Sequence, residues 1–217
     1  MRQHPKQLFG GKPVMAFRDE LSRRNFLKGA AVIGVGATLA TRYSVDRVAM
    51  AQASAGDLEI LNYALTLEYL EADFYAQGLE AGVLADRELE LVTPIGDHEQ
   101  THVDTLTSTI SDLGGTPVES PQFTYPDGTF ESRDAFLETA SIFEELGVTA
   151  YHGQVAAIES PELLAAAASI AGSESRHAAI IAELLGMRPF PESTVEASAT
   201  MEEVLAAAMP FIEGGSS

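Results

Sequence analysis

The sequence predicts an all-α protein, a four-helix bundle with one long crossover and a short C-terminal helix, and three observations lead to this fold class. Apolar residues recur every three or four positions in four separate segments, which is the spacing of a helix that buries one face. No segment shows strand-like alternation long enough to build a sheet. The 17-residue stretch 114–130 is rich in Gly, Pro, Ser and Thr, so it predicts a crossover between a second and a third helix that run parallel.

Two helices are expected before this crossover. The first covers about residues 57–78 and carries an apolar stripe at helical spacing. The second begins near Asp86 and ends at the glycine pair 114–115. Pro94 lies within it and either kinks the helix or marks its true start, because proline removes a backbone donor.

Two further helices and a short one are expected after the crossover. The third helix covers residues 132–158 and begins at a serine that can serve as N-cap. Residues 160–162, Ser-Pro-Glu, start the fourth, which ends at Gly186. An amphipathic segment, 201–211, is expected to pack on the bundle as a fifth helix, and the tail 214–217 is expected to be disordered.

The N-terminal segment has the pattern of an export signal. Residues 22–28, SRRNFLK, place Arg23 and Arg24 ahead of an apolar, Gly/Ala-rich stretch at 29–40. A small-x-small cleavage pattern, Ala-Met-Ala, follows at 49–51. This arrangement resembles a twin-arginine signal, and it predicts export to the periplasm, the cell surface or the exterior.

Residues 1–51 are therefore expected to be a signal peptide, and residues 52–213 a single bundle domain. The alternative interpretation is a single membrane anchor. The apolar run is shorter than the roughly 20 residues that a spanning helix needs, and Arg42 interrupts it. Stable membrane insertion of the mature chain is not expected, and the absence of cysteine excludes a lipid-anchored lipoprotein.

The charge of the expected mature region is strongly negative. Residues 52–217 hold only 4 of the 13 basic residues and 29 of the 32 acidic ones, a formal net charge of −25 (4 − 29). Such a surface repels nucleic acid and anionic membranes and attracts cations. It also suits a high-salt environment, where screening relieves self-repulsion. Because the chain has no cysteine, disulfides, zinc–thiolate sites and thiol catalysis are excluded.

The same site-building unit occurs twice in the chain. Each copy consists of a leading glutamate, a tyrosine seven positions later, and a Glu-x-x-His motif on the next helix. The leading glutamates precede their motifs by 31 and 30 residues. The first copy comprises Glu68, Tyr75, Glu99 and His102; the second comprises Glu144, Tyr151, Glu174 and His177.

This residue set predicts a two-metal carboxylate centre in the bundle core. A Glu and a His three positions apart face the same side of a helix, so they can serve one ion together. Four buried carboxylates repel each other strongly, and two divalent cations would neutralise them. Ligation by oxygen with one imidazole per ion favours iron or manganese over zinc or copper, and di-iron is favoured.

Neighbouring acidic residues leave alternatives open. Glu145 competes with Glu144 as the ligand of the third helix, and the pattern running on to Gly147 favours Glu144. Glu71 lies one turn after Glu68, where it could be a substitute ligand or support one. The favoured interpretation of Glu71 is a partly solvated neighbour.

The remaining histidines and the two repeated tyrosines are also open. His98 and His152 adjoin motif residues but are expected to point away from the shared stripe, as surface or rim histidines. Tyr75 and Tyr151 would lie two turns from their glutamates. Each could hydrogen-bond a ligand across the bundle or be an ordinary core tyrosine, and the sequence favours neither.

Two segments resemble a known family. Residues 65–72, LTLEYLEA, and 144–151, EELGVTAY, are similar to the first and third helices of ferritin-like domain proteins, in the secreted group that includes desiccation-related proteins. The resemblance covers about residues 57–186 and implies a metal centre that reacts with dioxygen or peroxide. The ligands that it implies are Glu68, Glu99, His102, Glu144, Glu174 and His177.

The function expected from this resemblance is oxidation of Fe(II) or reduction of peroxide outside the cytoplasm, in protection against stress. The alternative is a non-enzymatic, desiccation-related surface protein in which a bound metal mainly stabilises the bundle. A manganese catalase is a third interpretation. The partners expected are metal ions with dioxygen or peroxide, and self-association into a homo-oligomer is left open by the sequence.

Overall fold

The computed structural model describes residues 53–213, which form helices joined by loops, with no β-strand beyond an isolated bridge between Phe123 and Ile212. The main helices are α2 (Ala55–Ala81), α3 (Asp86–Asp112), α4 (Arg133–Gln154) and α5 (Pro161–Leu184). A short α6 (Met201–Ala208) and a 3-10 turn, η2 (Met209–Phe211), follow. The all-α bundle with a short C-terminal helix is thus confirmed.

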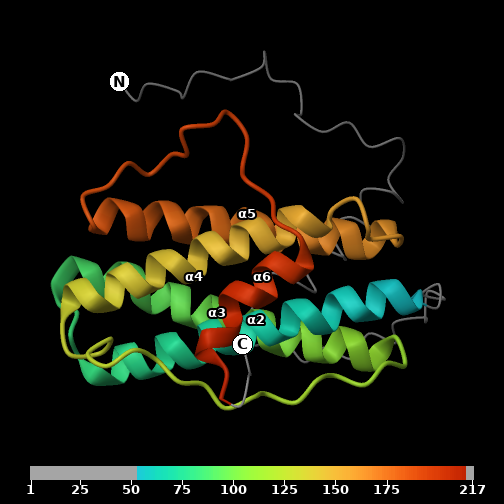
Figure 1. Cartoon of the computed structure of the whole chain (residues 1–217), viewed down its shortest axis with the longest axis horizontal. Coiled ribbons are helices and arrows are strands. Elements are labelled where there is room, and N and C mark those ends of the chain that lie inside the picture. Colours follow the sequence, from blue (N-terminus) through green and yellow to red (C-terminus); the bar gives the residue numbers. More distant parts are fainter. Residues whose placement is uncertain (1–52, 214–217) are drawn as a thin grey trace, which may run out of the picture. The chain divides into compact units, whose positions relative to one another are not determined.

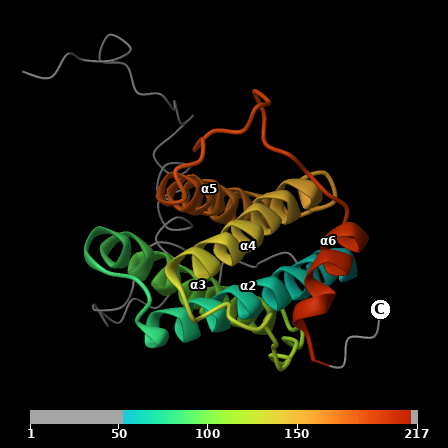
Figure 2. The same cartoon turned by 60° about the vertical axis from the view of Figure 1, so that its left-hand side comes forward.

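The four long helices form two antiparallel pairs. α2 packs mainly on α3, and α4 packs mainly on α5. The connection from α3 to α4, residues 113–132, runs the length of the bundle, so that α3 and α4 point in the same direction (Figure 1). α6 crosses the bundle obliquely, as a second view also shows (Figure 2).

Side-chain caps set the helix starts. Ser54, Ser132 and Ser160 each accept a hydrogen bond from a backbone N–H three residues later, which satisfies a donor that the helix itself cannot. Thr200 and Glu203 form a reciprocal capping box at the start of α6. α3 begins at Asp86 and continues through Pro94, so this proline is not the start of the helix.

Helix α4 is shorter than the sequence pattern predicts, because it ends at Gln154 rather than near residue 158. A tertiary contact holds the chain beyond it. The buried carboxylate of Asp57 accepts hydrogen bonds from the backbone N–H groups of Glu159, at 2.8 Å, and of Ser160, at 3.2 Å. α2 thereby holds the turn from which α5 starts.

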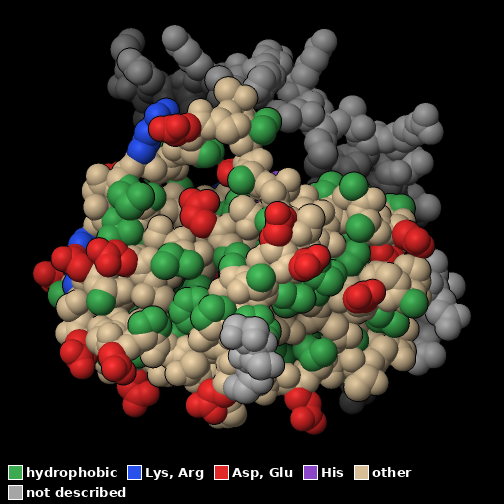
Figure 3. Space-filling model, viewed as in Figure 1, with side chains coloured by type: hydrophobic (Ala, Val, Ile, Leu, Met, Phe, Trp, Pro, Cys, Tyr) green, Lys and Arg blue, Asp and Glu red, His purple; other side chains and the backbone are tan. Residues whose placement is uncertain are grey.

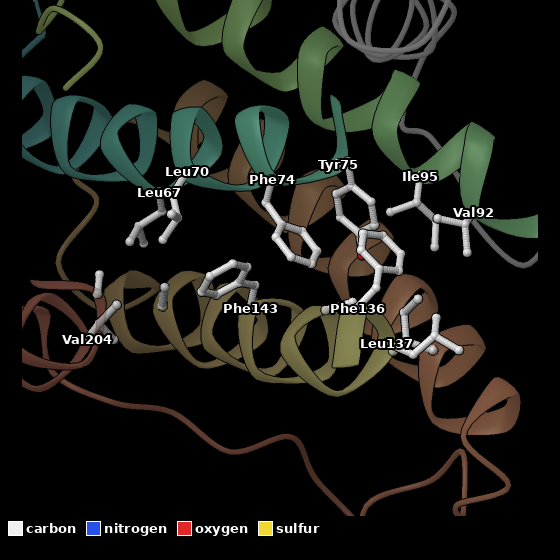
Figure 4. Close-up of a cluster of buried hydrophobic side chains, with 14 of the residues drawn as sticks. Leu67, Leu70, Phe74, Tyr75, Val92, Ile95, Phe136, Leu137, Phe143 and Val204 are labelled. Atoms are coloured by element: carbon white, nitrogen blue, oxygen red, sulfur yellow. The ribbon is translucent and has the colours of Figure 1, made fainter. Parts of the chain in front are cut away.

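An aromatic cluster packs between α2 and α4 (Figure 4). The rings of Phe74 and Phe136 stack with centroids 4.8 Å apart, and Phe143 meets Phe74 edge-on at 5.0 Å. Gly78 makes this packing feasible, since a Cβ there would lie 2.0 Å from the Phe136 ring. A second apolar cluster, which includes Leu65, gathers other buried side chains of the bundle.

The outer surface is acidic, with many carboxylates and few basic side chains on the face shown (Figure 3). None of the helices within residues 53–213 is long and apolar enough to span a bilayer. The expected signal, residues 1–51, and the tail, 214–217, lie outside the described residues.

Candidate metal centre

Four carboxylates, one from the middle of each long helix, meet inside the bundle. Glu68 on α2, Glu99 on α3, Glu144 on α4 and Glu174 on α5 are each 0% exposed to solvent. Isolated charges at such depth would be very costly, so groups of this kind are normally paired, protonated or bound to metal. The neighbouring Glu145 is exposed, so Glu144 is the carboxylate of α4 that points inward.

Two histidines complete the cluster and divide it into two overlapping groups. In each group the candidate ligand atoms all lie within 4.8 Å of one another. One group contains Glu68 and His102, the other contains Glu144 and His177, and both contain Glu99 and Glu174. The two groups thus share a pair of carboxylates, and each adds one Glu and one His of its own.

Both imidazoles turn Nδ1 towards the carboxylates. Nδ1 of His102 lies 3.1 Å from Oε2 of Glu68 and 3.0 Å from Oε2 of Glu99. Nδ1 of His177 lies 2.8 Å from Oε1 of Glu99 and 3.4 Å from Oε2 of Glu144. Each histidine therefore presents the same ring nitrogen to the carboxylates of its group.

The donor atoms in this cluster are incompletely satisfied by the protein. Eight buried side-chain N or O atoms among the described residues have no partner in hydrogen-bonding geometry, and six of them lie here: one oxygen each of Glu71, Glu99 and Glu144, both oxygens of Glu174, and Nδ1 of His177. Nδ1 of His177 and Oε1 of Glu99 are close, at 2.8 Å, but they are not aligned as a hydrogen bond. Buried polar atoms without partners are rare in native proteins, and each costs free energy. Bound cations would satisfy them, so these residues fit an oxygen-rich metal site.

The pKa values of the buried carboxylates also indicate that the cluster favours added positive charge. Burial raises the pKa of Glu174 well above its usual value, and repulsion from the other carboxylates adds to this. Burial also raises the pKa of Glu99 to about 7. For Glu68, burial is the largest single influence and would raise the pKa, but the charge of His102 and hydrogen bonds with His102, Glu99 and Tyr151 together outweigh it and lower the pKa.

The histidines are pushed towards the protonated form. Burial alone would lower the pKa of His102, but the charge of Glu68 and hydrogen bonds to Glu68 and Glu99 raise it to about 10. Burial opposes protonation of His177 too, and Glu144 and Glu99 raise its pKa to about 9. Protons thus balance the carboxylates of the free protein, and cations would displace those protons.

Each of the two tyrosines of the repeated unit hydrogen-bonds the leading glutamate of the other copy. The hydroxyl of Tyr75, in the first copy, donates to Oε1 of Glu144 in the second. The hydroxyl of Tyr151, in the second copy, donates to Oε1 of Glu68 in the first. Both rings are buried, so each tyrosine is a core residue that also orients a leading glutamate.

Glu71 differs from its expected environment. The favoured interpretation, a partly solvated neighbour, is wrong, because Glu71 is only 3% exposed. Burial raises its pKa well above the usual value, and repulsion from Glu99, Glu144 and Glu68 adds to this. Room for this fifth carboxylate comes from Gly147, where a Cβ would lie 3.2 Å from Oε1 of Glu71 and 3.0 Å from Oε2 of Glu174.

His98 was expected to be a rim histidine, and it is exposed, but its contact with the cluster was not foreseen. Nδ1 of His98 lies 2.9 Å from Nε2 of His177, on the side of the ring that faces away from the carboxylates. A signal for this was present in the sequence, because His98 and His102 are four residues apart and share one helix face. His152 instead donates from Nδ1 to the carbonyl of Val148 in its own helix, at 2.8 Å.

Comparisons with known proteins agree with this geometry. A family model described as a ferritin-like domain matches residues 56–187, which span all four long helices apart from Ala55, the first residue of α2. A second model, described as a twin-arginine translocation pathway signal sequence, matches residues 20–40. A search of curated proteins found no match.

Proposed function

Because the chain belongs to the ferritin-like domain family and carries a twin-arginine signal that directs it to the periplasm or beyond, we propose that it is an exported di-metal carboxylate protein. Its proposed activity is oxidation of Fe(II) or reduction of peroxide, in protection against oxidative stress or drying. The observation that carries this proposal is the sharing of Glu99 and Glu174 by two buried groups of donor atoms. One ion would require only one of the two groups, four of the six residues.

The proposed ligands follow from the two groups. Glu68 and His102 would hold one ion, Glu144 and His177 the other, and Glu99 and Glu174 both. Four carboxylates balance the charge of two divalent ions, and iron or manganese suits their oxygen-rich surroundings. When bound, such a pair supplies two electrons, which with two protons reduce one peroxide to two waters.

The protein's own residues have three tasks in this proposal. Tyr75 and Tyr151 orient the outer carboxylates by hydrogen bonds to Glu144 and Glu68. The two apolar clusters, one containing Phe74 and the other Leu65, limit the access of water to the centre. Glu71 is a buried carboxylate beside the centre, and we assign it a supporting position there.

Metal content is the first test of this proposal. The purified protein is expected to bind two ions of iron or manganese per chain, measured by elemental analysis after reconstitution. Joint replacement of Glu99 and His177 by alanine is expected to abolish binding. The matched control is Glu145→Gln, which removes an exposed carboxylate next to Glu144 and is expected to leave the metal content unchanged. Absence of metal from the reconstituted wild type would overturn the proposal.

Turnover is the second test. Fe(II) oxidation under air, followed optically, is expected for the wild type and not for Glu144→Ala. Two ions bound without turnover would favour the non-enzymatic alternative, in which the metal stabilises the bundle. Vigorous oxygen release from peroxide by the manganese form would instead indicate a catalase.

A further inference from the structure

The two copies of the site-building unit match at every proposed ligand but differ at the residue just before each Glu-x-x-His motif. His98 precedes Glu99, whereas Ser173 precedes Glu174. An imidazole therefore stands at one of two otherwise corresponding positions. The two proposed ion positions differ accordingly in what surrounds their histidines.

The contact of His98 uses the nitrogen of His177 that the centre leaves free. Nδ1 of His177 faces the carboxylates, 2.8 Å from Oε1 of Glu99, and Nε2 faces His98 at 2.9 Å. The two rings are nearly parallel, with centroids 5.2 Å apart and an angle of 25° between their planes. His177 is thus held from both sides, although only its Nδ1 side lies in the centre.

The direction of this hydrogen bond follows from ligand chemistry. If Nδ1 of neutral His177 donates its lone pair to an ion, Nε2 must carry the proton. Nε2 then donates to Nδ1 of His98, whose own proton lies on Nε2. Hydrogen bonds of this kind fix the tautomer and the ring orientation of a ligating histidine and raise its basicity.

Building on the proposed function, we propose that His98 is a positioning residue that makes the two ion positions unequal, so that the ion held by Glu144 and His177 binds more tightly than the ion held by Glu68 and His102. Within residues 53–213, no side chain hydrogen-bonds Nε2 of His102. The same ligand set therefore has an outer partner at one end and none among these residues at the other.

The test is stepwise binding of Co(II) to the purified protein, followed by calorimetry and by visible absorbance. The wild type is expected to bind two ions in resolved steps. His98→Leu removes the acceptor and is expected to weaken the tighter step by about 10- to 100-fold. His98→Asn can place an amide oxygen where Nδ1 was and is expected to restore most of the loss. His152→Leu is the matched control, since it removes a histidine outside the centre.

Double variants assign the affected position. Glu68→Gln weakens the other position, so His98→Leu is expected still to weaken the ion that remains. In a Glu144→Gln background, where the position beside His177 is already impaired, His98→Leu is expected to have little further effect. A general loss of structure would produce the same change in both backgrounds.

The outcomes separate this inference from the function on which it rests. If the wild type binds two ions with equal affinity, if His98→Leu binds them as the wild type does, or if His98→Asn is as impaired as His98→Leu, the inference is wrong while the di-metal centre stands. If the wild type binds no metal at all, the proposed function fails first.

Discussion

Gly147→Ala is expected to impair metal binding although it adds only one methyl group to a helix. A Cβ at this position would lie 3.0 Å from Oε2 of Glu174 and 3.2 Å from Oε1 of Glu71. Both distances are shorter than ordinary carbon–oxygen contacts, so the carboxylates must retreat by a few tenths of an ångström. Because Glu174 belongs to both groups of donor atoms, a displaced Glu174 affects both ions.

Gly172 provides a control for the effect of Gly147→Ala on stability. Replacing a helical glycine by alanine stabilises a helix by about 1 kcal/mol, and Gly172 on α5 has nothing within 4 Å of its would-be Cβ. Gly172→Ala should therefore show that gain alone. If Gly147→Ala weakens each ion about tenfold, it removes about 1.4 kcal/mol of metal-linked stability per ion, or about 3–5 °C in melting temperature.

The assay is thermal unfolding of both variants by circular dichroism, with excess Mn(II) and with a chelator. Gly172→Ala is expected to keep the full rise in Tm that Mn(II) gives to the wild type, and Gly147→Ala to lose a large part of it. Equal metal-linked rises in the two variants would refute the claim that Gly147 makes room for the carboxylates.

Two further predictions concern the core and the effect of pH. Gly78→Ala is expected to lower stability by about 1–3 kcal/mol, despite its helix-forming gain, because its Cβ would overlap the Phe136 ring; metal content should not change, and a more stable variant would contradict this. The metal-free protein is expected to lose stability from pH 5 to pH 9. The folded-state pKa values of Glu71, Glu174, His102 and His177 are raised, so the folded state holds extra protons that it loses as pH rises. Melts with a chelator should show this decline, and melts with Mn(II), which displaces those protons, should show a larger metal-linked gain at higher pH; a chelated protein that gains stability over this range would contradict the reasoning.

The sequence predicted the fold and the inward-facing residues because those depend on local patterns. Helical periodicity, N-cap serines and the long 114–130 stretch are all readable in one dimension, and they imply the two antiparallel pairs and the crossover. The choice of Glu144 over Glu145 was likewise a matter of helix face. The structure buries Glu144 and exposes Glu145.

The sequence did not predict features that depend on contacts between different helices. Glu71 is buried because the facing position on α4 is a glycine, and no pattern within α2 reveals that. The contact between His98 and His177 joins α3 to α5 and depends on how closely these helices approach. The early end of α4 likewise accompanies the carboxylate of Asp57 on α2, far away in the sequence.

The repeated unit explains why Glu71 and Gly147 belong together. Glu71 follows Glu68 by three residues, and Gly147 follows Glu144 by three, so the two occupy corresponding positions in the two copies. They also face each other, with 3.2 Å between Oε1 of Glu71 and the Cβ that Gly147 lacks. Two glutamates could not occupy this space together, so the pseudo-symmetry must be broken at this position.

The two copies also differ at His98 and Ser173, and, as with Glu71 and Gly147, the difference lies outside the six proposed ligands. All six proposed ligands, and the crossed tyrosines that orient two of them, obey the repeat. Any difference in chemistry between the two proposed ion positions would then originate in residues that differ between the copies. Glu71 adds a buried carboxyl group beside the centre and His98 adds a hydrogen-bond acceptor behind His177, so these two side chains would make the two proposed ion positions distinct.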